Sequence, residues 1–376
     1  MVHMLIGFTF FLFSIFWFLV GLNVLAWLIA RRWLKGEDLR QFDRPTGERF
    51  SSGDQPSAEI QAVVASFSGM RTILKNVPLH RRVQALRVHM DEMFAARDFS
   101  GFTFVPVNSD GVVGEWVFAP GFDGSRRSLY IHGGAFSMGS PRSHRTVTTR
   151  FAEMTGGAVL ALDYRLMPEH GRHAGIDDCR TAYRWMLDNG PTGPAPAQAV
   201  FVAGDSAGGN LTLSLVAWVR DTGLRAPDAA VALSPLTDAT LVSPTFKTHV
   251  RTDALLGPMF GVMARVPRYL MLWIGLFQAR INPRNPMISP VYGNLAGLPP
   301  ILVQVGESEM LRDDARRYVN RAQAAGSPVR LQTWDHVMHV WQIFNPELPE
   351  ARQALDEIDR FLASISPPAK RSHPAT

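Results

Sequence analysis

The pentapeptide Gly204-Asp205-Ser206-Ala207-Gly208 fits the pattern Gly-x-Ser-x-Gly and directly follows four apolar residues. A helix-like stretch, residues 210–220, comes next. This order of strand, tight turn and helix holds a serine hydroxyl clear of the backbone, where it can act as a nucleophile. Because glycines lack Cβ atoms, the strand and the helix can approach closely. A glycine-rich turn with an incidental serine would also fit, so the rest of the chain must decide.

A serine nucleophile needs three further parts: N–H donors for an oxyanion, a general base, and a carboxylate that orients the base. The segment His132-Gly133-Gly134-Ala135 follows an apolar stretch, and its adjacent glycines can turn their N–H groups into a cavity. Carboxylates follow a second apolar stretch at 306–314, and His336 and His339 follow a third. The order serine, acid, histidine is the one that α/β-hydrolases have. We expect His132 to brace its turn by hydrogen bonding and not to act as the base.

Strand-like segments alternate with helical ones along most of the chain. A hairpin is predicted at 102–108 and 112–119, followed by a strand at 128–131. Later strands are predicted at 158–163, 199–203, 229–233, 301–305 and 329–334, and helices at 176–187, 211–220, 313–325 and 350–361. This alternation predicts an α/β fold with a mostly parallel sheet and helices on both faces. The sheet would bring the candidate residues to one edge, because they follow the carboxyl ends of its strands.

Two segments outside this alternation could cover that edge. Residues 58–74 and 79–96 have helical periodicity and could form a lid, although helices that merely connect the N-terminus to the body fit equally well. Residues 236–288 break the alternation, and their apolar part, 255–277, is interrupted by Gly, Pro and Arg. We interpret this insertion as a helical cap over the edge where open α/β sheets bind ligands. An ordinary buried helix pair is the alternative interpretation.

Residues 4–30 are almost continuously apolar and carry no charge. About 20 helical residues span the hydrocarbon core of a bilayer, and Trp27 and Trp33 lie near one end, as interfacial aromatic residues do. A cleaved signal peptide fits poorly, because the apolar run is long, no basic region precedes it and no small-residue cleavage site follows. We therefore expect an uncleaved anchor that meets the lipid bilayer through residues 4–30.

The charges that flank this apolar segment all lie on its C-terminal side. Arg31, Arg32, Lys35 and Arg40 follow the segment, and no Lys or Arg precedes it. The positive-inside rule places this flank, and the large domain behind it, on the cytoplasmic side of a single-pass protein. The same cations could bind anionic lipid headgroups.

Composition limits the remaining possibilities. The 376 residues are 46% hydrophobic, which is enough for a sizeable core and excludes global disorder. The net charge of +5 is not concentrated in a Lys/Arg run, and no nucleic-acid motif is present, so we expect no nucleic-acid partner. The single cysteine, Cys179, cannot form an internal disulfide and is expected to be a buried small residue. No metal-ligand spacing is present, and the sequence does not indicate an oligomeric state.

Several motifs together resemble one family. In chain order they are His132-Gly133-Gly134, Ser140-Pro141, Asp163-Tyr164-Arg165-Leu166 with Pro168-Glu169-His170, Gly204-Asp205-Ser206-Ala207-Gly208-Gly209, Ser289-Pro290 and Gly297-Leu298-Pro299-Pro300. Residues 66–361 resemble the hormone-sensitive-lipase-like family of α/β-hydrolases, and most of all its bacterial esterases of the monoterpene ε-lactone hydrolase and acetyl-hydrolase type. The N-terminal apolar segment lies outside this resemblance.

The resemblance implies a catalytic role for three residues. Ser206 would be the nucleophile, and Glu309 the acid, at a position where many members have Asp. His339 would be the base, and His336 a structural neighbour. No metal or organic cofactor is implied.

The resemblance also assigns the residues around this triad. The implied oxyanion donors are the N–H groups of Gly133, Gly134 and Ala207. His132 and Asp205 would support them, and Ala135 stands where the family often has a third glycine. Asp313 and Asp314 match neighbouring acidic positions and are expected to cap the following helix, where they suit its dipole.

These expectations combine into one organisation and one function. The expected parts are an anchor with its basic flank (1–35), a linker (36–57), an N-terminal helical lid (58–100), an α/β-hydrolase domain (101–366, cap 236–288) and a disordered tail (367–376). The expected function is serine carboxylic-ester hydrolysis of small or medium hydrophobic esters through a Ser-His-Glu triad and an acyl-enzyme. Lactone hydrolysis or acyl transfer by the same triad is the alternative. A non-catalytic ligand-binding member of the fold would be expected to lack a triad residue, and none is lost.

Overall fold

The computed structural model describes residues 2–366. Nine of the described strands form one sheet, in the order β1-β11-β10-β9-β8-β4-β5-β3-β2. Neighbours from β1 to β5 in this order are parallel, whereas β3 pairs antiparallel with both β5 and β2. The strands are β1 (Glu48–Phe50), β2 (Thr103–Ser109), β3 (Val112–Phe118), β4 (Asp123–Ile131), β5 (Gly157–Leu162), β8 (Ala199–Asp205), β9 (Ala229–Leu233), β10 (Ile301–Gly306) and β11 (Val329–Trp334). The predicted α/β fold with a mostly parallel sheet is confirmed.

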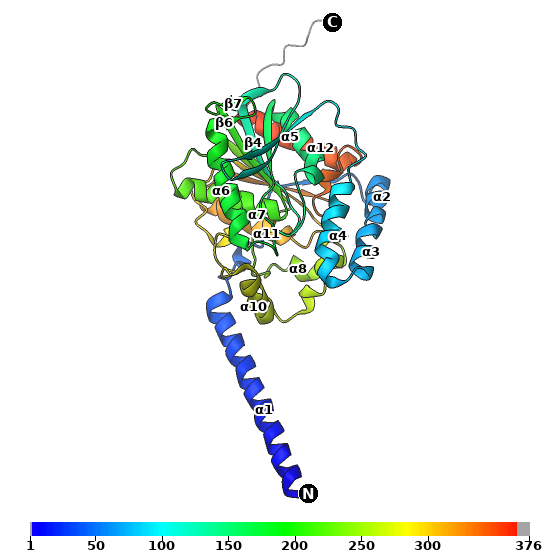
Figure 1. The fold of residues 1–376 in the computed structure, drawn as a ribbon, viewed down its shortest axis with the longest axis vertical. Helices are drawn as coiled ribbons and strands as arrows, with labels where there is room; N and C mark the ends of the chain where they lie inside the picture. The colour runs from blue at the N-terminus through cyan, green and yellow to red at the C-terminus, as the bar shows by residue number, and fades with distance from the viewer. Residues whose placement is uncertain (1, 367–376) are drawn as a thin grey trace.

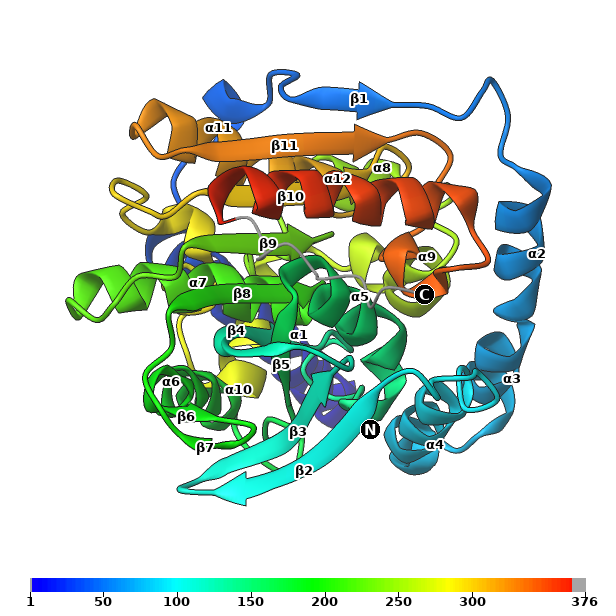
Figure 2. The same ribbon diagram turned by 90° about the horizontal axis from the view of Figure 1, so that it is seen from above.

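Helices cover both faces of this sheet (Figure 2). They are, on one face, α5 (Arg145–Thr155) and α12 (Pro349–Ile365), and, on the other, α6 (Arg172–Asp188), α7 (Ala207–Asp221) and α11 (Arg312–Ala324). Each face of the sheet has its own hydrophobic core, and alternate residues of β8 point into the two cores. Val200 and Val202 pack toward α6 and α7, and Phe201 and Ala203 pack toward α5 and α12. Because both faces of the sheet are buried, its central strands are continuous apolar runs, which is why they were visible in the sequence.

Two elements were missed in the sequence. β1 lies inside the predicted linker, where it adds a parallel edge strand beside β11; it has three residues, of which Glu48 and Arg49 are exposed. α5 has little apolar periodicity because four of its buried residues are threonines, Thr146, Thr148, Thr149 and Thr155. A minor hairpin, β6 (Asn189–Gly190) and β7 (Gly193–Pro194), was also not predicted. The predicted tail at 367–376 lies outside the described residues.

The N-terminal helices pack against the carboxyl-terminal part of the hydrolase domain. They are α2 (Ala58–Ser66), α3 (Ser68–Asn76) and α4 (Leu79–Glu92), three helices where two were predicted. The extra break falls at Phe67, which is 2% exposed and whose ring lies 5.8 Å from that of Phe344. Burying this aromatic side chain against the body fixes the angle between α2 and α3.

The predicted cap insertion consists of short helices at the base of the domain (Figure 1). They are α8 (Thr245–Thr248), α9 (Leu256–Phe260), a 3-10 turn (Met263–Arg265) and α10 (Arg268–Ala279). α10 is the element that touches the N-terminal helix: Leu272 packs with Ala30 and Leu34, and Trp273 Nε1 donates to the Ala26 carbonyl over 3.1 Å.

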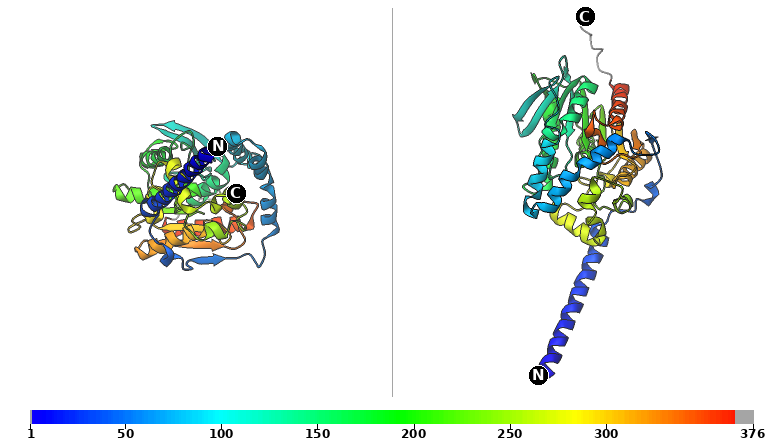
Figure 3. Two further views of the ribbon diagram at one scale, coloured as in Figure 1. Left: turned by 90° about the horizontal axis from the view of Figure 1, so that it is seen from below. Right: turned by 90° about the vertical axis from the view of Figure 1, so that its right-hand side faces the viewer.

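The N-terminal helix α1 (Val2–Ile29) projects away from the hydrolase domain and continues into a π-helical turn, Ala30–Leu34 (Figures 1 and 3). Its span Phe8–Leu34 has a mean hydropathy of 2.2, and its described side chains face outward rather than into a protein core. By length and composition α1 can cross a membrane, and a signal sequence would meet the same criterion.

The turn between β8 and α7 leaves no room for a side chain at Gly208. A Cβ atom there would lie 1.9 Å from the Ile131 carbonyl oxygen and 2.6 Å from that of His132. Both obstacles are backbone atoms at the end of the central strand β4, so they cannot swing aside. This contact holds the turn of β8 directly beside the loop that follows β4.

We expect Gly208→Ala to lower the free energy of unfolding by about 2 kcal/mol or more, because overpacking a rigid contact is destabilising. Urea denaturation followed by circular dichroism would measure it. Gly101→Ala is the matched control, since no atom lies within 4 Å of a Cβ built there. Equal stability of the two variants would contradict the proposed close contact.

Candidate active site

Ser206 occupies the sharp turn between β8 and α7, with φ 52° and ψ −113°. A non-glycine residue rarely adopts such a conformation, and the strain, of the order of 1–3 kcal/mol, persists only where the surroundings enforce it. Here the Ser206 N–H donates to the Leu233 carbonyl over 2.7 Å, and its own carbonyl accepts from Asn210 N–H over 3.0 Å. The turn therefore lifts the side chain off the sheet while the backbone stays fixed on both sides.

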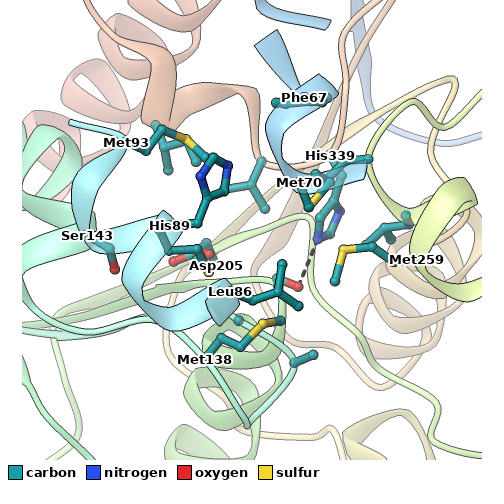
Figure 4. A pocket seen from close by; sticks show the side chains of 18 of the residues that line it. Phe67, Met70, Leu86, His89, Met93, Met138, Ser143, Asp205, Met259 and His339 are labelled. Carbon is teal, nitrogen blue, oxygen red and sulfur yellow. Dashed lines mark hydrogen bonds between the residues drawn. The ribbon is translucent and has the colours of Figure 1, made fainter. Parts of the chain in front are cut away.

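His339 lies in the loop after β11 and reaches Ser206 directly. Its Nε2 is 2.8 Å from Ser206 Oγ, the bond drawn as a dashed line in Figure 4. Its Nδ1 is 2.7 Å from Glu309 Oε2. His336 precedes it in the same loop, but its side chain forms no hydrogen bond with Ser206 or Glu309 among the described residues.

Glu309 lies in the loop after β10 and is completely buried. Its second oxygen, Oε1, accepts from the Gly306 N–H over 2.6 Å and from Ser234 Oγ over 2.8 Å. Ser234 follows β9, and its hydroxyl also accepts from the Val340 N–H over 3.2 Å. The carboxylate thus connects the loops that follow three neighbouring strands, β9, β10 and β11.

The buried carboxylate controls the protonation of the imidazole. Burial opposes the charged form of His339, but the charge of Glu309 and the hydrogen bond between them outweigh burial, so the pKa of His339 is raised above its ordinary value. Asp253 acts in the same direction. The geometry and the raised pKa match what a general base and its orienting acid require.

The loop after β4 passes beside the serine. The Gly133 N–H donates to Asp205 Oδ1 over 3.0 Å, so this amide is occupied and does not face a substrate. The expected role of Gly133 as an oxyanion donor is therefore not supported by its geometry. By contrast, the N–H groups of Gly134 and Ala135 have no acceptor in the described chain, and both residues line the cavity at Ser206.

Asp205 organises a buried polar cluster behind this loop. Its Oδ1 also accepts from Tyr130 OH over 2.9 Å and lies 3.4 Å from His144 Nε2. Burial alone would raise the pKa of Asp205, but the charge of His144 and the hydrogen bonds outweigh it, so the pKa is lowered. A charged Asp205 fixes Gly133, and with it the amides that follow.

His132 braces its own turn, as expected. Its Nδ1 is 2.7 Å from the Gly133 carbonyl oxygen, and its ring stacks on Tyr164 at 4.4 Å between centroids. Burial and the neighbouring His144 lower the pKa of His132 to about 3, so it stays neutral. Among the described residues, the His132 side chain has no hydrogen bond with Ser206 or His339.

The expected capping role of two acidic residues is wrong. Asp313 and Asp314 do lie in the first turn of α11, but their side chains point to the loop after β9. Asp314 Oδ2 accepts from the N–H groups of Thr237 and Asp238, and Asp313 Oδ2 from that of Thr245. These carboxylates satisfy the buried backbone of the cap insertion, because a buried N–H without an acceptor is costly.

Two cavities meet at Ser206. The first, of about 110 Å³, also contains His339 and lies beneath α3, α4 and α9 (Figure 4). Its wall is mainly methionine and aromatic side chains: Phe67, Met70, Met90, Met93, Phe94, Met138 and Met259. The second, of about 230 Å³, contains Ala207 but not His339 and is bounded by α9 and α10 through Phe260, Met271 and Ile274.

Three residues of the site were not identified from the sequence. Ser234 and His144 each follow a recognisable signal, the end of strand β9 and the Ser140-Pro141 motif. Asp253 lies in the cap insertion, is buried, and accepts from the Met310 N–H over 2.9 Å, beside the acid. Only the position of Asp253 immediately before the apolar run of 254–256, as at a helix N-terminus, could have singled it out.

Comparisons with known proteins agree with this geometry. Residues 128–343 match the family described as having the alpha/beta hydrolase fold. An acetyl-hydrolase of Streptomyces hygroscopicus is 40% identical over 252 residues, 67% of this chain and 80% of that protein. A carboxylesterase/phospholipase of Mycobacterium tuberculosis is 33% identical over 284 residues, 72% of this chain and 73% of that one.

Solved structures give the same result. The crystal structure of an esterase from the bacterial hormone-sensitive lipase family superposes with a TM-score of 0.70 and 35% identity, covering 82% of this chain and 98% of that one. A hormone-sensitive lipase from a metagenome library superposes with a TM-score of 0.68 at 28% identity, covering 83% and 99%. The chain therefore belongs to the hormone-sensitive-lipase-like family of α/β-hydrolases and is a carboxylic-ester hydrolase.

Proposed function

We propose that this protein hydrolyses hydrophobic carboxylic esters through Ser206, His339 and Glu309. The observation that carries the proposal is the continuous hydrogen-bonded chain from Ser206 Oγ through the imidazole to a fully buried carboxylate, at 2.8 and 2.7 Å. His339 Nε2 takes the hydroxyl proton as Ser206 Oγ bonds to the ester carbonyl carbon. The same proton then passes to the departing alcohol, and an acyl-enzyme remains. Water then loses a proton to His339 and attacks the acyl carbon; the bond to Ser206 Oγ breaks, His339 returns the proton to Oγ, and the carboxylic acid is released.

We propose Gly134, Ala135 and Ala207 as the oxyanion donors. The N–H groups of Gly134 and Ala135 have no acceptor within residues 2–366, and Ala207 is the residue after the proposed nucleophile, at the N-terminus of α7. Backbone N–H groups that are fixed before reaction stabilise developing negative charge without reorganisation. Ala135 has φ 54°, so the backbone there adopts a left-handed conformation even though the residue is not glycine.

The position of the base separates the two cavities by role. The leaving oxygen must lie within hydrogen-bond reach of His339 Nε2. The alcohol part of the ester therefore fits the first cavity, under α3 and α4, which contains His339. The acyl part fits the second cavity, beside Ala207 and α10. Both walls are mainly apolar, in keeping with small or medium hydrophobic esters.

We further propose that α1 anchors the enzyme in a lipid bilayer. Support comes from its apolar length, its outward-facing side chains and the exposed Trp27 and Trp33 at its domain end. We propose a cytoplasmic hydrolase domain, and the support for it is the positive-inside rule applied to the cations Arg31, Arg32 and Lys35 at the same end.

Ser206→Ala should abolish turnover of p-nitrophenyl butyrate while the thermal midpoint stays close to that of the parent enzyme. The oxygen that attacks the ester is removed, whereas the backbone bonds of the turn remain. Activity is read from p-nitrophenolate release, and folding from circular dichroism. Undiminished hydrolysis by a folded Ser206→Ala enzyme would refute the proposed nucleophile.

His339→Ala and His336→Ala distinguish the base from its neighbour in the same loop. Removing the base should lower kcat by about 10³-fold or more, the scale found for members of such triads. His336→Ala should retain kcat within a few-fold, because this side chain does not reach Ser206. The opposite ranking in a steady-state assay would reassign the base.

The pH profile tests the role of the acid. Because the neutral imidazole is the active form, kcat/KM should fall as the pH drops through the raised pKa of His339, above its ordinary 6.5. Glu309→Gln removes the charge that raises this pKa and leaves the burial that lowers it. The acid limb should therefore move to lower pH, while kcat falls by roughly 10²–10⁴-fold.

Glu307→Gln is the control for this profile. Glu307 lies on the same loop but pairs with Arg312 and Arg316 instead of the imidazole. The acid limb of the kcat/KM profile of Glu307→Gln should coincide with that of the parent enzyme. An acid limb that does not move in Glu309→Gln would exclude Glu309 as the partner of the base.

A further inference from the structure

The cap helix α10 is apolar over most of its circumference, and Arg268 and Gln278 are its only charged or amide side chains. One side packs on α1 and the turn after it, through Tyr269, Leu272, Trp273 and Leu276. The opposite side lines the second cavity, through Met271, Ile274, Gly275 and Gln278. Between them, Leu270 is 38% and Phe277 73% exposed, and Ile274 is 39% exposed as well as lining the cavity. A helix without a polar face is typical of burial in protein or membrane. The side of α10 that carries Leu270, Ile274 and Phe277 is nevertheless uncovered.

More of the cap shares this exposure. Val262, in the turn before α10, is 74% exposed. Together with Leu270, Ile274 and Phe277 it forms the exposed apolar side chains of the cap, which we call the docking face. Grouped exposed apolar residues on one element mark a site that another surface covers.

The docking face lies at the level where α1 would leave a membrane. Tyr269 OH donates to Asn23 Oδ1 and Trp273 Nε1 to the Ala26 carbonyl, so α10 lies beside α1 from Asn23 onward. The part of α1 beyond this contact, residues 2–22, would be about 31 Å long as an α-helix, which matches the roughly 30 Å hydrocarbon core. With this part of α1 in the hydrocarbon core, α10 and the residues that it contacts would fall in the interfacial layer.

The charge around the docking face suits anionic lipid headgroups. Residues 254–306 contain four arginines and no Asp or Glu, and the first acidic residue of the chain is Glu37. The exposed cations of these two segments are Arg31, Arg32, Lys35, Arg265, Arg280 and Arg284. Within the described residues none of the six forms an ion pair, so their charges remain free to meet headgroup phosphates.

From these observations we infer that the docking face rests on an anionic lipid bilayer and that esters dissolved in this bilayer reach Ser206 past α10. The inference builds on the proposed function, because it supplies the substrate's route to the same serine. The occupant is the headgroup and upper acyl layer of the membrane that α1 enters. Basic charge beside exposed apolar residues is the composition of an interfacial membrane surface.

A groove provides the route. It has a volume of about 880 Å³ and extends from the exposed Phe277 and Arg280 to Ala135 and Phe136, beside the serine. Along its length it shares residues with the second cavity, among them Phe260, Met263, Gly275 and Gln278. An acyl chain can therefore pass from the docking face into the proposed acyl cavity along the residues that the groove shares with that cavity, whereas Glu169, His170 and Arg172 line the groove outside this shared part.

The first experiment measures docking without using activity. Full-length protein carrying Val262→Cys is labelled with an environment-sensitive fluorophore and reconstituted into vesicles of phosphatidylcholine and phosphatidylglycerol; the native Cys179 is buried. The emission should shift to the blue and be quenched by a lipid-borne nitroxide. Val113→Cys, at an exposed apolar position on β3, should be neither shifted nor quenched. A Val262 label that emits as in water overturns the docking face.

The second experiment measures substrate delivery. We expect Val262→Asp/Leu270→Asp to lower hydrolysis of vesicle-dissolved p-nitrophenyl decanoate about fivefold or more, as two apolar contacts with the interface become charges. Hydrolysis of water-soluble p-nitrophenyl acetate should stay within about twofold, because neither residue lines a cavity at Ser206. Val113→Asp, the matched control, should change neither rate.

The possible outcomes separate this inference from the function on which it rests. Equal losses on both esters, or no loss on either, would overturn bilayer delivery. Wild-type enzyme that hydrolyses the acetate but not the decanoate would preserve the proposed function and also overturn delivery. Faster hydrolysis of the decanoate in vesicles that contain phosphatidylglycerol, with loss of this preference at high salt, would support the proposed contact between the exposed cations and the headgroups, since salt screens exposed charges.

Discussion

The active site depends on one buried charge, the carboxylate of Glu309. An ionised carboxylate away from water is tolerated only when it is paired and hydrogen-bonded. Here His339, Ser234 and the Gly306 N–H meet that requirement: Gly306 ends β10, Ser234 follows β9, and His339 lies in the loop after β11. The ion pair and hydrogen bonds of the Glu309 carboxylate therefore fix the ends of β9, β10 and β11 relative to one another. The strained turn at Ser206 is placed by the same edge, because its N–H bonds to the last residue of β9.

This dependence explains how much of the site could be predicted from the sequence. The strands are apolar runs buried on both faces, so their ends could be located, and with them Ser206, the acidic segment 306–314 and the two histidines. The family resemblance was needed to select Glu309 and His339 among these candidates. The loops are different, because a loop residue's role depends on which partner its N–H or side chain finds in space. Gly133 turns its amide to Asp205, and Asp313 and Asp314 bond to the cap insertion rather than to their own helix. Nothing local in the sequence distinguishes these choices from the expected ones.

Two features of the N-terminal part could not be predicted either, because tertiary contacts define them. A break at Phe67 divides a predicted helix because a tertiary contact with Phe344 outweighs helical periodicity. β1 was hidden inside a polar linker because an edge strand of three residues needs only a neighbour, β11, and no apolar pattern. The apolar length of α1, in contrast, is a property of composition alone, so it was visible at once.

α10 lines the proposed acyl cavity on one side and contacts the N-terminal helix on the other. In the proposed mechanism the alcohol leaves on the side of His339, beneath α3 and α4, and the acyl group stays beside α10. The opposite side of α10 contacts α1. One helix thus separates the acyl cavity from the anchor, and both of its neighbours are apolar. A polar stripe would weaken one of these contacts, which accounts for a cap helix whose sequence, Arg268–Ala279, has no acidic residue and a single amide, Gln278.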